Sequence, residues 1–178
     1  MSYIIRFMNV IDSFLPRFFE GIANPPLDSL MVFLTRLGDG GVVWIFLIIA
    51  LLVTKKYRRT AMVAAGSLLF CFILGNYLIK PFFGRIRPCN IDATLRMLIE
   101  RPIDFSFPSM HTATAFSVAV VIYGKNKFFG ILMIVLSCLI ALSRVYLNVH
   151  YTTDIIFGAL FGTAVALAFR LVSRKLKK

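Results

Sequence analysis

Long apolar runs separated by short polar segments dominate the pattern along this chain. The runs occupy about residues 41–54, 60–79, 110–124, 127–147 and 151–172. A helix needs about 20 apolar residues to cross the hydrocarbon core of a bilayer, with a range of roughly 17–25. The first and third runs are short alone, but each can include flanking residues. The pattern therefore predicts five membrane-spanning helices.

The N-terminal segment has a different pattern. Among its Ile, Phe, Met and Leu residues lie four charged ones, Arg6, Asp12, Arg17 and Glu20. This pattern is typical of an amphipathic helix at a membrane surface, and a poor first span is the alternative. A signal peptide is not indicated, because the charges interrupt the apolar stretch and no small-residue cleavage site follows. We therefore expect an all-α, integral-membrane helical bundle of five to six transmembrane helices.

Two breaks divide the first third of the chain. Asn24-Pro25-Pro26 ends the N-terminal segment, and a short helical pattern over residues 27–37 stops at Gly38-Asp39-Gly40-Gly41. The glycine cluster indicates a turn and not a phosphate-binding P-loop, because the Lys-Ser/Thr pair and the preceding strand are absent. We therefore expect an amphipathic or first-span segment over residues 1–26 and one membrane domain over residues 27–178.

Composition and charge support a membrane protein. Hydrophobic residues make up 59% of the chain and charged residues 16%, against roughly 45–50% and 25% in soluble globular domains. The net charge of +12 would suggest nucleic-acid binding in a soluble protein, but the basic residues here punctuate apolar runs. Basic loops that meet anionic lipid headgroups are the better interpretation. The three cysteines form neither a disulfide framework nor a metal-ligand cluster.

The placement of lysine and arginine predicts the topology. Three basic clusters fall on the same side of the five predicted spans: residues 55–59, 125–127 and 170–178. The positive-inside tendency makes that side cytoplasmic. The extracytoplasmic side then holds three other connections: the glycine turn at 38–41, the long loop 81–108 and the short turn 144–150.

Residues that can carry chemistry collect on that extracytoplasmic side. They end or open four of the predicted spans: Lys80, Arg85, Arg87, Ser109, His111, Ser143, Arg144, His150 and Asp154. Any one of them alone is most simply an interfacial anchor. Both histidines of the protein, four cations and an acid together indicate a functional site instead.

Two segments have the pattern of a phosphoryl-transfer site. Pro108-Ser109 before an apolar run is a helix N-cap signal, and the free N–H groups of Met110 and His111 would bind an anion there. His111 can also protonate a leaving oxygen. Asp154 lies four residues after His150 and can fix the imidazole tautomer through one nitrogen, which leaves the other nitrogen as a nucleophile.

Cations complete this pattern. Arg87 and Arg144 can form forked contacts to a phosphate, and Lys80 adds a point charge. Such charge suits a phosphoryl group, which is negative throughout its transfer. A metal site is the competing interpretation, but the remaining acids, such as Asp39 and Asp104, have no convincing metal-ligand spacing. We therefore expect no metal.

These residues, in this order, resemble the type 2 phosphatidic acid phosphatase family, whose relatives include vanadium haloperoxidases and bacterial acid phosphatases. The family pattern of Lys, six residues and Arg-Pro stands here from Lys80 to Arg87-Pro88. Pro-Ser-Gly-His stands as Pro108-Ser109-Met110-His111. Ser-Arg, five residues, His, three residues and Asp stands as Ser143-Arg144, His150 and Asp154. The flanking spans are similar to those of the small bacterial membrane members.

The resemblance implies a role for each residue. His150 attacks phosphorus to form a phosphohistidine, Asp154 orients His150, and His111 protonates the leaving oxygen and then activates water. Five groups hold the phosphate oxygens: Lys80, Arg87, Ser109, Arg144 and the backbone N–H of Met110. No cofactor or metal is implied. Arg85 lies outside the family pattern, and we expect it to be an accessory headgroup or interface contact.

Met110 departs from the family pattern, which has glycine at this position. A helix N-terminus needs no positive φ, so we expect a modest effect on the backbone. We expect the methionine side chain to crowd the pocket and alter substrate choice, and the loop over residues 89–107 to cover the site.

The resemblance implies hydrolysis of the terminal phosphate of a lipid phosphate or diphosphate. Undecaprenyl diphosphate is the first expected substrate, with phosphatidylglycerophosphate, phosphatidic acid and a lipid A phosphate as alternatives, because the motifs do not read the lipid tail. An anion or lipid transporter and a non-catalytic lipid-binding protein are the competing classes. We expect a multi-pass protein of the bacterial inner (cytoplasmic) membrane whose active site faces the extracytoplasmic side. Its partners are membrane lipids and not nucleic acid, and the sequence leaves the oligomeric state open.

Overall fold

The computed structural model describes residues 2–176, with side chains from residue 10 onward, and every regular element there is helical. The helices in chain order are α1 (Ser2–Ile22), α2 (Pro25–Gly38), α3 (Val42–Val53), α4 (Arg58–Leu74), α5 (Lys80–Phe83), α6 (Pro88–Ile91), α7 (Met110–Tyr123), α8 (Lys127–Tyr146) and α9 (Thr152–Lys175). A 3-10 turn, η1 (Asp39–Gly41), joins α2 to α3, and a π-helical turn, η2 (Gly75–Ile79), joins α4 to α5. The prediction of an all-α fold is confirmed.

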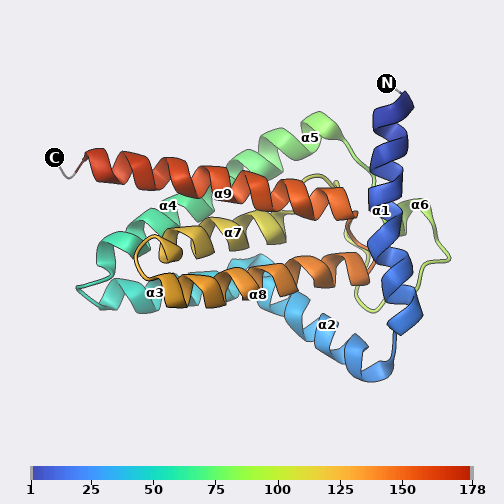
Figure 1. Cartoon of the computed structure of the whole chain (residues 1–178), viewed down its shortest axis with the longest axis horizontal. Helices are drawn as coiled ribbons and strands as arrows, with labels where there is room; N and C mark the ends of the chain where they lie inside the picture. Colours follow the sequence, from blue (N-terminus) through green and yellow to red (C-terminus); the bar gives the residue numbers. More distant parts are fainter. Residues whose placement is uncertain (1, 177–178) are drawn as a thin grey trace.

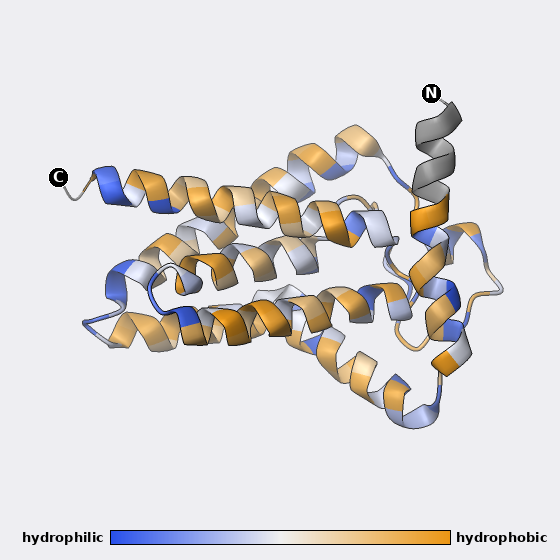
Figure 2. Cartoon of the chain, in the orientation of Figure 1, coloured by the Kyte–Doolittle hydropathy of each residue, from blue (hydrophilic) through white to orange (hydrophobic). Residues whose placement is uncertain are grey.

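The long helices form one bundle with two distinct ends. In Figure 1, α3, α4, α7, α8 and α9 run along the long axis, and α1 stands across one end of it. The α3–α4 and α7–α8 connections and the C-terminal end of α9 lie at the opposite end, where hydrophilic residues gather (Figure 2). The three predicted basic clusters, the last as far as residue 176, therefore share one end of the bundle; Lys177 and Lys178 lie outside the described residues.

Among the described residues, four helical stretches are long and apolar enough to cross a membrane. They are Pro25–Val53, Arg58–Phe83, Lys127–Tyr146 and Thr152–Lys175. Many large apolar side chains on them point outward, as expected for contact with lipid chains; examples are Phe46, Leu69, Ile131, Val135, Leu160 and Leu171. The run predicted at 110–124 forms α7, which has only 14 residues.

The boundaries of α2 and α3 follow the predicted breaks. The side chain of Asn24 accepts a hydrogen bond from the backbone N–H of Leu27 at 3.0 Å and caps α2. The prolines in the first turn of α2 cost little, because the first N–H groups of a helix have no partner within it. Gly40 and Gly41 adopt φ of +59° and +70° in the turn before α3. The glycine cluster is therefore a turn, as its sequence indicates.

The second predicted span is longer than its sequence pattern. The apolar run ends near residue 79, yet the helix continues through η2 and α5 to Phe83. Gly84 then ends it in the left-handed conformation, with φ of +56°, which a glycine adopts without strain. The chain consequently turns back toward the bundle just before Arg85 and Arg87.

Helix α7 is the centre of the bundle. Nearly all of its side chains are buried, and it packs against α4, α8 and α9. The main apolar cluster joins Val118 of α7 to Trp44 of α3 and Ile140 of α8, each 0% exposed. Because its neighbours cover it on all sides, α7 does not need the outward apolar face of the other helices.

Two glycines of α9 bring its backbone against α7. A Cβ atom on Gly162 would lie 2.1 Å from the carbonyl oxygen of Ala113, and one on Gly158 would lie 2.7 Å from that of Ser109. Small residues four apart are a common means of close helix contact in membranes. This contact fixes the start of α7, with Ser109 and His111, beside the start of α9.

We predict that Gly162→Ala destabilises the fold by about 1–3 kcal/mol, because the new methyl group must push two backbones apart. The measurement is thermal unfolding of the purified protein in detergent. Gly21→Ala is the matched control, since no atom lies within 4 Å of a Cβ placed there. A control-like melting temperature for Gly162→Ala would show that the two helices are not in close contact.

Candidate active site

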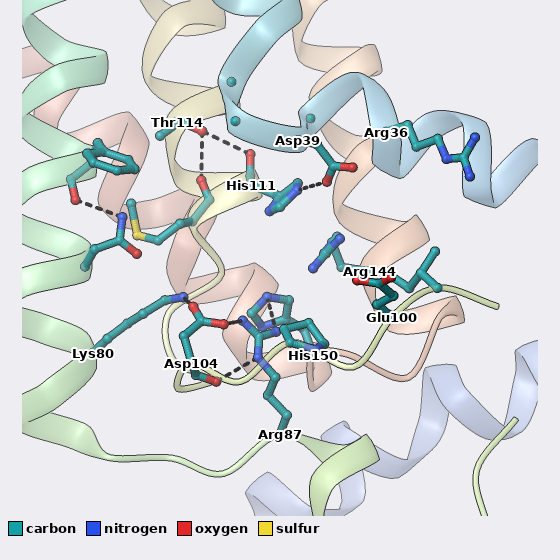
Figure 3. A pocket seen from close by; sticks show the side chains of 18 of the residues that line it. Arg36, Asp39, Lys80, Arg87, Glu100, Asp104, His111, Thr114, Arg144 and His150 are labelled. Atoms are coloured by element: carbon teal, nitrogen blue, oxygen red, sulfur yellow. Dashed lines mark hydrogen bonds and ion pairs between the residues drawn. The ribbon is translucent and has the colours of Figure 1, made fainter. Parts of the chain in front are cut away.

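A cavity of about 920 Å³ opens at the end of the bundle near α1. Six of the eight predicted site residues line it: Lys80, Arg87, Met110, His111, Arg144 and His150. They come from α5, the α5–α6 connection, the start of α7, the end of α8 and the turn before α9 (Figure 3). The other two, Ser109 and Asp154, are fully buried and do not line the cavity.

The ring of His150 is held between an acid and a cation. Its Nδ1 lies 3.3 Å from Oδ2 of Asp154, and its Nε2 lies 3.0 Å from Nη1 of Arg87. Because a guanidinium can only donate, Nε2 must accept and the ring hydrogen must be on Nδ1, facing Asp154. We infer this tautomer from the donor geometry. The lone pair of Nε2 is therefore available on the side of Arg87 and the cavity.

The His150–Asp154 pair arises differently from the shared helix face that the spacing suggested. Helix α9 begins only at Thr152, so His150 lies in the turn before it. Asp154, in the first turn of α9, reaches back and also accepts from the N–H of Tyr151 at 2.9 Å. The carboxylate thus ties the helix start and the imidazole together.

His150 is neutral at physiological pH. Burial lowers the pKa of His150 well below its usual range, and the positive charges of Arg87 and Arg144 lower it further. Each of these influences disfavours the imidazolium form. The ring therefore does not need to lose a proton before it can act as a nucleophile.

Two residues that sequence analysis did not assign to the site complete the surroundings of Asp154. The hydroxyl of Ser106, from the long loop, donates to Oδ2. Arg85 donates from Nη1 to Oδ1 at 2.7 Å. Arg85 does not line the cavity, and its expected role as an accessory headgroup or interface contact stays a prediction.

Three buried cations surround the cavity. The exposed fractions are 5% for Lys80 and 3% for both Arg87 and Arg144. Asp104, from the long loop, pairs with Nζ of Lys80 and, at 2.7 Å, with Nη2 of Arg87. The loop thus places a carboxylate on the cations that sequence analysis assigned to phosphate.

Asp104 stays ionised under ordinary conditions. Burial raises the pKa of Asp104, but the hydrogen bond from Lys80 and the charges of Arg87 and Lys80 outweigh burial and lower it to about 2. Asp104 is also about half exposed. A carboxylate at the open edge of the cavity is therefore able to leave the cations without losing its charge.

Arg144 differs from the other two cations. Its Nη1 donates to Oγ1 of Thr35 at 2.5 Å. Within residues 10–176 it forms no ion pair, and its Nε has no hydrogen-bond partner. A buried charge without a counter-charge is unfavourable. The cavity beside Arg144 is therefore suited to an anion.

His111 lies on the cavity wall with an acid of its own. Its Nε2 is 2.8 Å from Oδ1 of Asp39, in the turn between α2 and α3 (Figure 3). The turn predicted from the glycine cluster thus also supplies an acid to the cavity wall. In the part of the chain that the structure describes, no group of three or more His, Cys, Asp or Glu side chains is placed to hold a metal ion.

The start of α7 accommodates both Ser109 and Met110. Ser109 precedes the helix as its N-cap residue, and its Oγ accepts a hydrogen bond from Thr112 at 3.0 Å. The contact between this hydroxyl and phosphate stays a prediction. Met110 does not have a positive φ, since Asn148 is the one non-glycine residue of the described chain that does. The expectation of an unstrained backbone at Met110 is confirmed.

Gly75 provides the space for the methionine side chain. A Cβ atom on Gly75 would lie 2.2 Å from Sδ of Met110. The side chain therefore packs against the π-helical turn and lines the cavity from there. Because Gly75 has no side chain, the fold accommodates methionine at position 110, where the family pattern has glycine.

Comparison with known proteins identifies the family. Residues 60–178 match the PAP2 superfamily. An undecaprenyl-diphosphatase from Sulfolobus acidocaldarius is 33% identical over 141 residues, which are 79% of this chain and 68% of that protein. A lipid A 4'-phosphatase from Bacteroides thetaiotaomicron is 28% identical in an alignment 187 positions long that covers 97% of this chain and 81% of that protein.

A solved structure shares the fold. The crystal structure of a transmembrane PAP2-type phosphatidylglycerolphosphate phosphatase from Bacillus subtilis aligns with a TM-score of 0.77, over 99% of this chain and 97% of that one. The sequence identity of 22% makes this a likeness of fold alone. From the family match and the identity to the Sulfolobus protein, the chain belongs to the PAP2 superfamily and is a membrane lipid phosphate phosphatase, a hydrolase.

Proposed function

We propose that this hydrolase removes the terminal phosphate of a lipid phosphate or diphosphate through a phosphohistidine on Nε2 of His150. The observation that carries the proposal is the buried charge of Arg144, which has no acidic partner in the described chain and lies on the same cavity as His150. A phosphate would supply the missing negative charge. It would also present its phosphorus to Nε2 of the imidazole, once the hydrogen bond from Arg87 to that nitrogen is broken.

The reaction proceeds in two steps. Nε2 of His150 attacks phosphorus, the bond from phosphorus to the leaving oxygen breaks, and His111 donates a proton to that oxygen. Water then attacks the phosphohistidine, and His111 takes a proton from it, which releases inorganic phosphate and restores His150. Asp154 accepts the hydrogen bond from Nδ1–H and stabilises the positive charge that forms on the ring.

Positive charge holds the phosphate oxygens in both steps. Lys80, Arg87 and Arg144 stabilise the transferring group, and the backbone N–H of Met110 adds a donor at the helix start. Ser109 is assigned to the same set. Because Asp104 pairs with Lys80 and Arg87 in the absence of substrate, a phosphate has to replace this carboxylate. No metal ion is needed in this scheme.

Undecaprenyl diphosphate is the substrate that we favour. The Sulfolobus relative is named for activity on this lipid, and a cavity of about 920 Å³ has room for two phosphates. The Bacteroides relative is named for lipid A. Lipid A phosphate, phosphatidylglycerophosphate and phosphatidic acid therefore remain the alternatives.

The proposal includes five crossings of an inner (cytoplasmic) membrane, and the four long apolar stretches support it. Helix α7, about 21 Å long, makes the fifth crossing because the four longer spans shield it. The basic end of the bundle lies in the cytoplasm, so the cavity faces the extracytoplasmic side. We place α1 along the outer membrane surface, since it crosses the bundle end (Figure 1) and directs Val10, Phe14 and Phe18 outward.

We predict that the protein, purified in detergent and kept in EDTA, releases inorganic phosphate from undecaprenyl diphosphate faster than from the three alternative lipids. The measurement is a phosphate-release panel across the four lipids. His150→Ala should lose activity by at least about 10³-fold while its melting temperature stays near that of the wild type. Release that depends on an added metal ion, or an active His150→Ala protein, would contradict the mechanism; no release from any lipid would favour a transporter.

We predict that Asp104→Asn lowers the KM for the lipid by about threefold to tenfold, because the phosphate no longer competes with a carboxylate for Lys80 and Arg87. Since the pKa of Asp104 is about 2, the competition in the wild type should be constant between pH 5 and 9. Asp92→Asn is the matched control: it lies in the same loop, and its carboxylate caps Thr94. A higher KM in Asp104→Asn would mean that the carboxylate positions the cations instead.

A further inference from the structure

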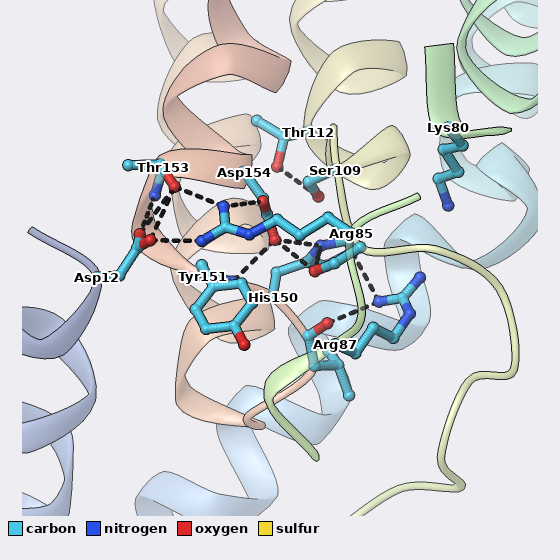
Figure 4. A network of polar contacts seen from close by, with 12 residues as sticks. Asp12, Lys80, Arg85, Arg87, Ser109, Thr112, His150, Tyr151, Thr153 and Asp154 are labelled. Atoms are coloured by element: carbon cyan, nitrogen blue, oxygen red, sulfur yellow. Dashed lines mark hydrogen bonds and ion pairs between the residues drawn. The ribbon is translucent and has the colours of Figure 1, made fainter. Parts of the chain in front are cut away.

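Arg85 joins the N-terminal helix to the catalytic acid. Its Nη2 lies 2.5 Å from Oδ2 of Asp12 on α1, and its Nη1 lies 2.7 Å from Oδ1 of Asp154 on α9 (Figure 4). The guanidinium also stacks on the ring of Tyr151, with Cζ 3.9 Å from the ring centre. One cation thus bridges two acids that are far apart in the sequence.

Asp12 is built into the start of α9. It is 8% exposed, and its Oδ1 accepts from both the backbone N–H and the hydroxyl of Thr153, each at 2.8 Å. The first N–H groups of a helix have no partner within it, so an acid from another helix supplies one here. Phe19, about two turns further along α1, packs edge-on against Tyr146 of α8, with their ring centres 5.4 Å apart. Helix α1 is therefore docked on the bundle through both polar and apolar contacts.

Arg85 also holds the other groups around Asp154. Its backbone carbonyl accepts from the N–H of Ser106 at 2.7 Å, and its Nη1 donates to Oγ1 of Thr153 at 2.7 Å. Ser106 in turn donates to Asp154. With Arg85 on Oδ1 and Ser106, Tyr151 and His150 on Oδ2, the carboxylate has a single orientation.

The positive charge of Arg85 compensates the two carboxylates that it bridges. Asp12 and Asp154 are both buried, and Arg85 is the cation that pairs with each of them within residues 10–176. Without Arg85, two buried carboxylates would lie close together with no cation between them, which is unfavourable. Asp154 could then no longer accept the Nδ1–H of His150 in a fixed geometry.

We propose that Arg85 and Asp12 are positioning residues of the active site, through which α1 fixes the orientation and charge of Asp154 and hence the tautomer of His150. The proposal rests on the function proposed above for its kinetic test. Neither residue lines the cavity, so we expect neither to touch the phosphate. Their effect is therefore expected on kcat and not on KM.

The kinetic test is a double-mutant cycle with the lipid that the wild type hydrolyses fastest. Arg85→Gln should lower kcat by about 10–100-fold and leave KM within about twofold. In an Asp154→Asn background the same substitution should have almost no further effect, because it acts through Asp154. Asp12→Asn should also lower kcat. Arg85→Lys should keep part of the kcat that Arg85→Gln loses. Equal effects of Arg85→Gln in both backgrounds, or a rise in KM alone, would overturn the proposal.

Arg96→Gln is the matched control. Arg96 also pairs with an acid on an N-terminal helix, with Nη1 2.9 Å from Oδ2 of Asp28 on α2, but it touches neither Asp154 nor the cavity. This variant should keep the kcat of the wild type. Loss of kcat in Arg96→Gln equal to that in Arg85→Gln would show a general effect of weakening the outer end of the bundle.

A spectroscopic test separates this proposal from the proposed function. The chain has two histidines, so the ¹⁵N spectrum of histidine-labelled protein in detergent reports each ring. The wild type should show a neutral His150 with hydrogen on Nδ1, and Arg85→Gln should shift or split that signal while His111 stays unchanged. A protein that hydrolyses no lipid but shows this change would refute the function and support the positioning role; an unchanged His150 signal would refute the positioning role.

Discussion

Three cationic side chains lie almost fully buried among apolar helices, and the rest of the site is arranged around that fact. A buried charge destabilises a fold unless opposite charge or hydrogen bonds compensate it. Asp104 compensates Lys80 and Arg87, whereas within the described residues the guanidinium of Arg144 only donates a hydrogen bond to the hydroxyl of Thr35. Because the compensation is incomplete, the free protein retains a need for an anion. The same buried positive charges thus destabilise the folded bundle and favour the phosphate binding proposed above.

The two histidines occupy different surroundings, which suits two different roles. His150 is enclosed, with one nitrogen facing Asp154 and the other facing Arg87. His111 lies on the cavity wall beside Asp39, whose side chain is more than half exposed. A ring that is fixed in one tautomer suits attack on phosphorus, and a ring near water with an acid beside it suits repeated gain and loss of a proton.

Periodicity and local turn chemistry made most of the fold predictable. The apolar runs at 110–124 and 127–147 became α7 and α8 within a residue, and the breaks at Asn24 and the glycine cluster lie where the sequence puts them. The continuation of the second span to Phe83 was missed, because Pro81 and a polar end obscure a helix that depends on a π-helical turn.

The motif residues of the site also follow from the sequence, since six of the eight line one cavity. Their supporting residues do not follow from it. Asp104 and Ser106 lie in a loop without periodicity, and the contacts of Asp12, Asp39 and Arg85 depend on how helices dock, which local pattern does not encode. An acid among the apolar residues of a predicted helix, such as Asp12 in the N-terminal segment, was the one sequence feature that pointed to such a supporting contact.

The shortness of α7 has a consequence for how a lipid meets this enzyme. Fourteen helical residues span about 21 Å, which is roughly 9 Å less than the hydrocarbon layer of a typical bilayer. At the end of the bundle near α1, α7 stops short of α8 and α9 (Figure 1), and this is the end that carries His111. Under the function proposed above, the reacting bond would then lie below the usual plane of the headgroups. A lipid would then enter laterally from the bilayer at its own depth. The water that hydrolyses the phosphohistidine would have to reach it through the cavity.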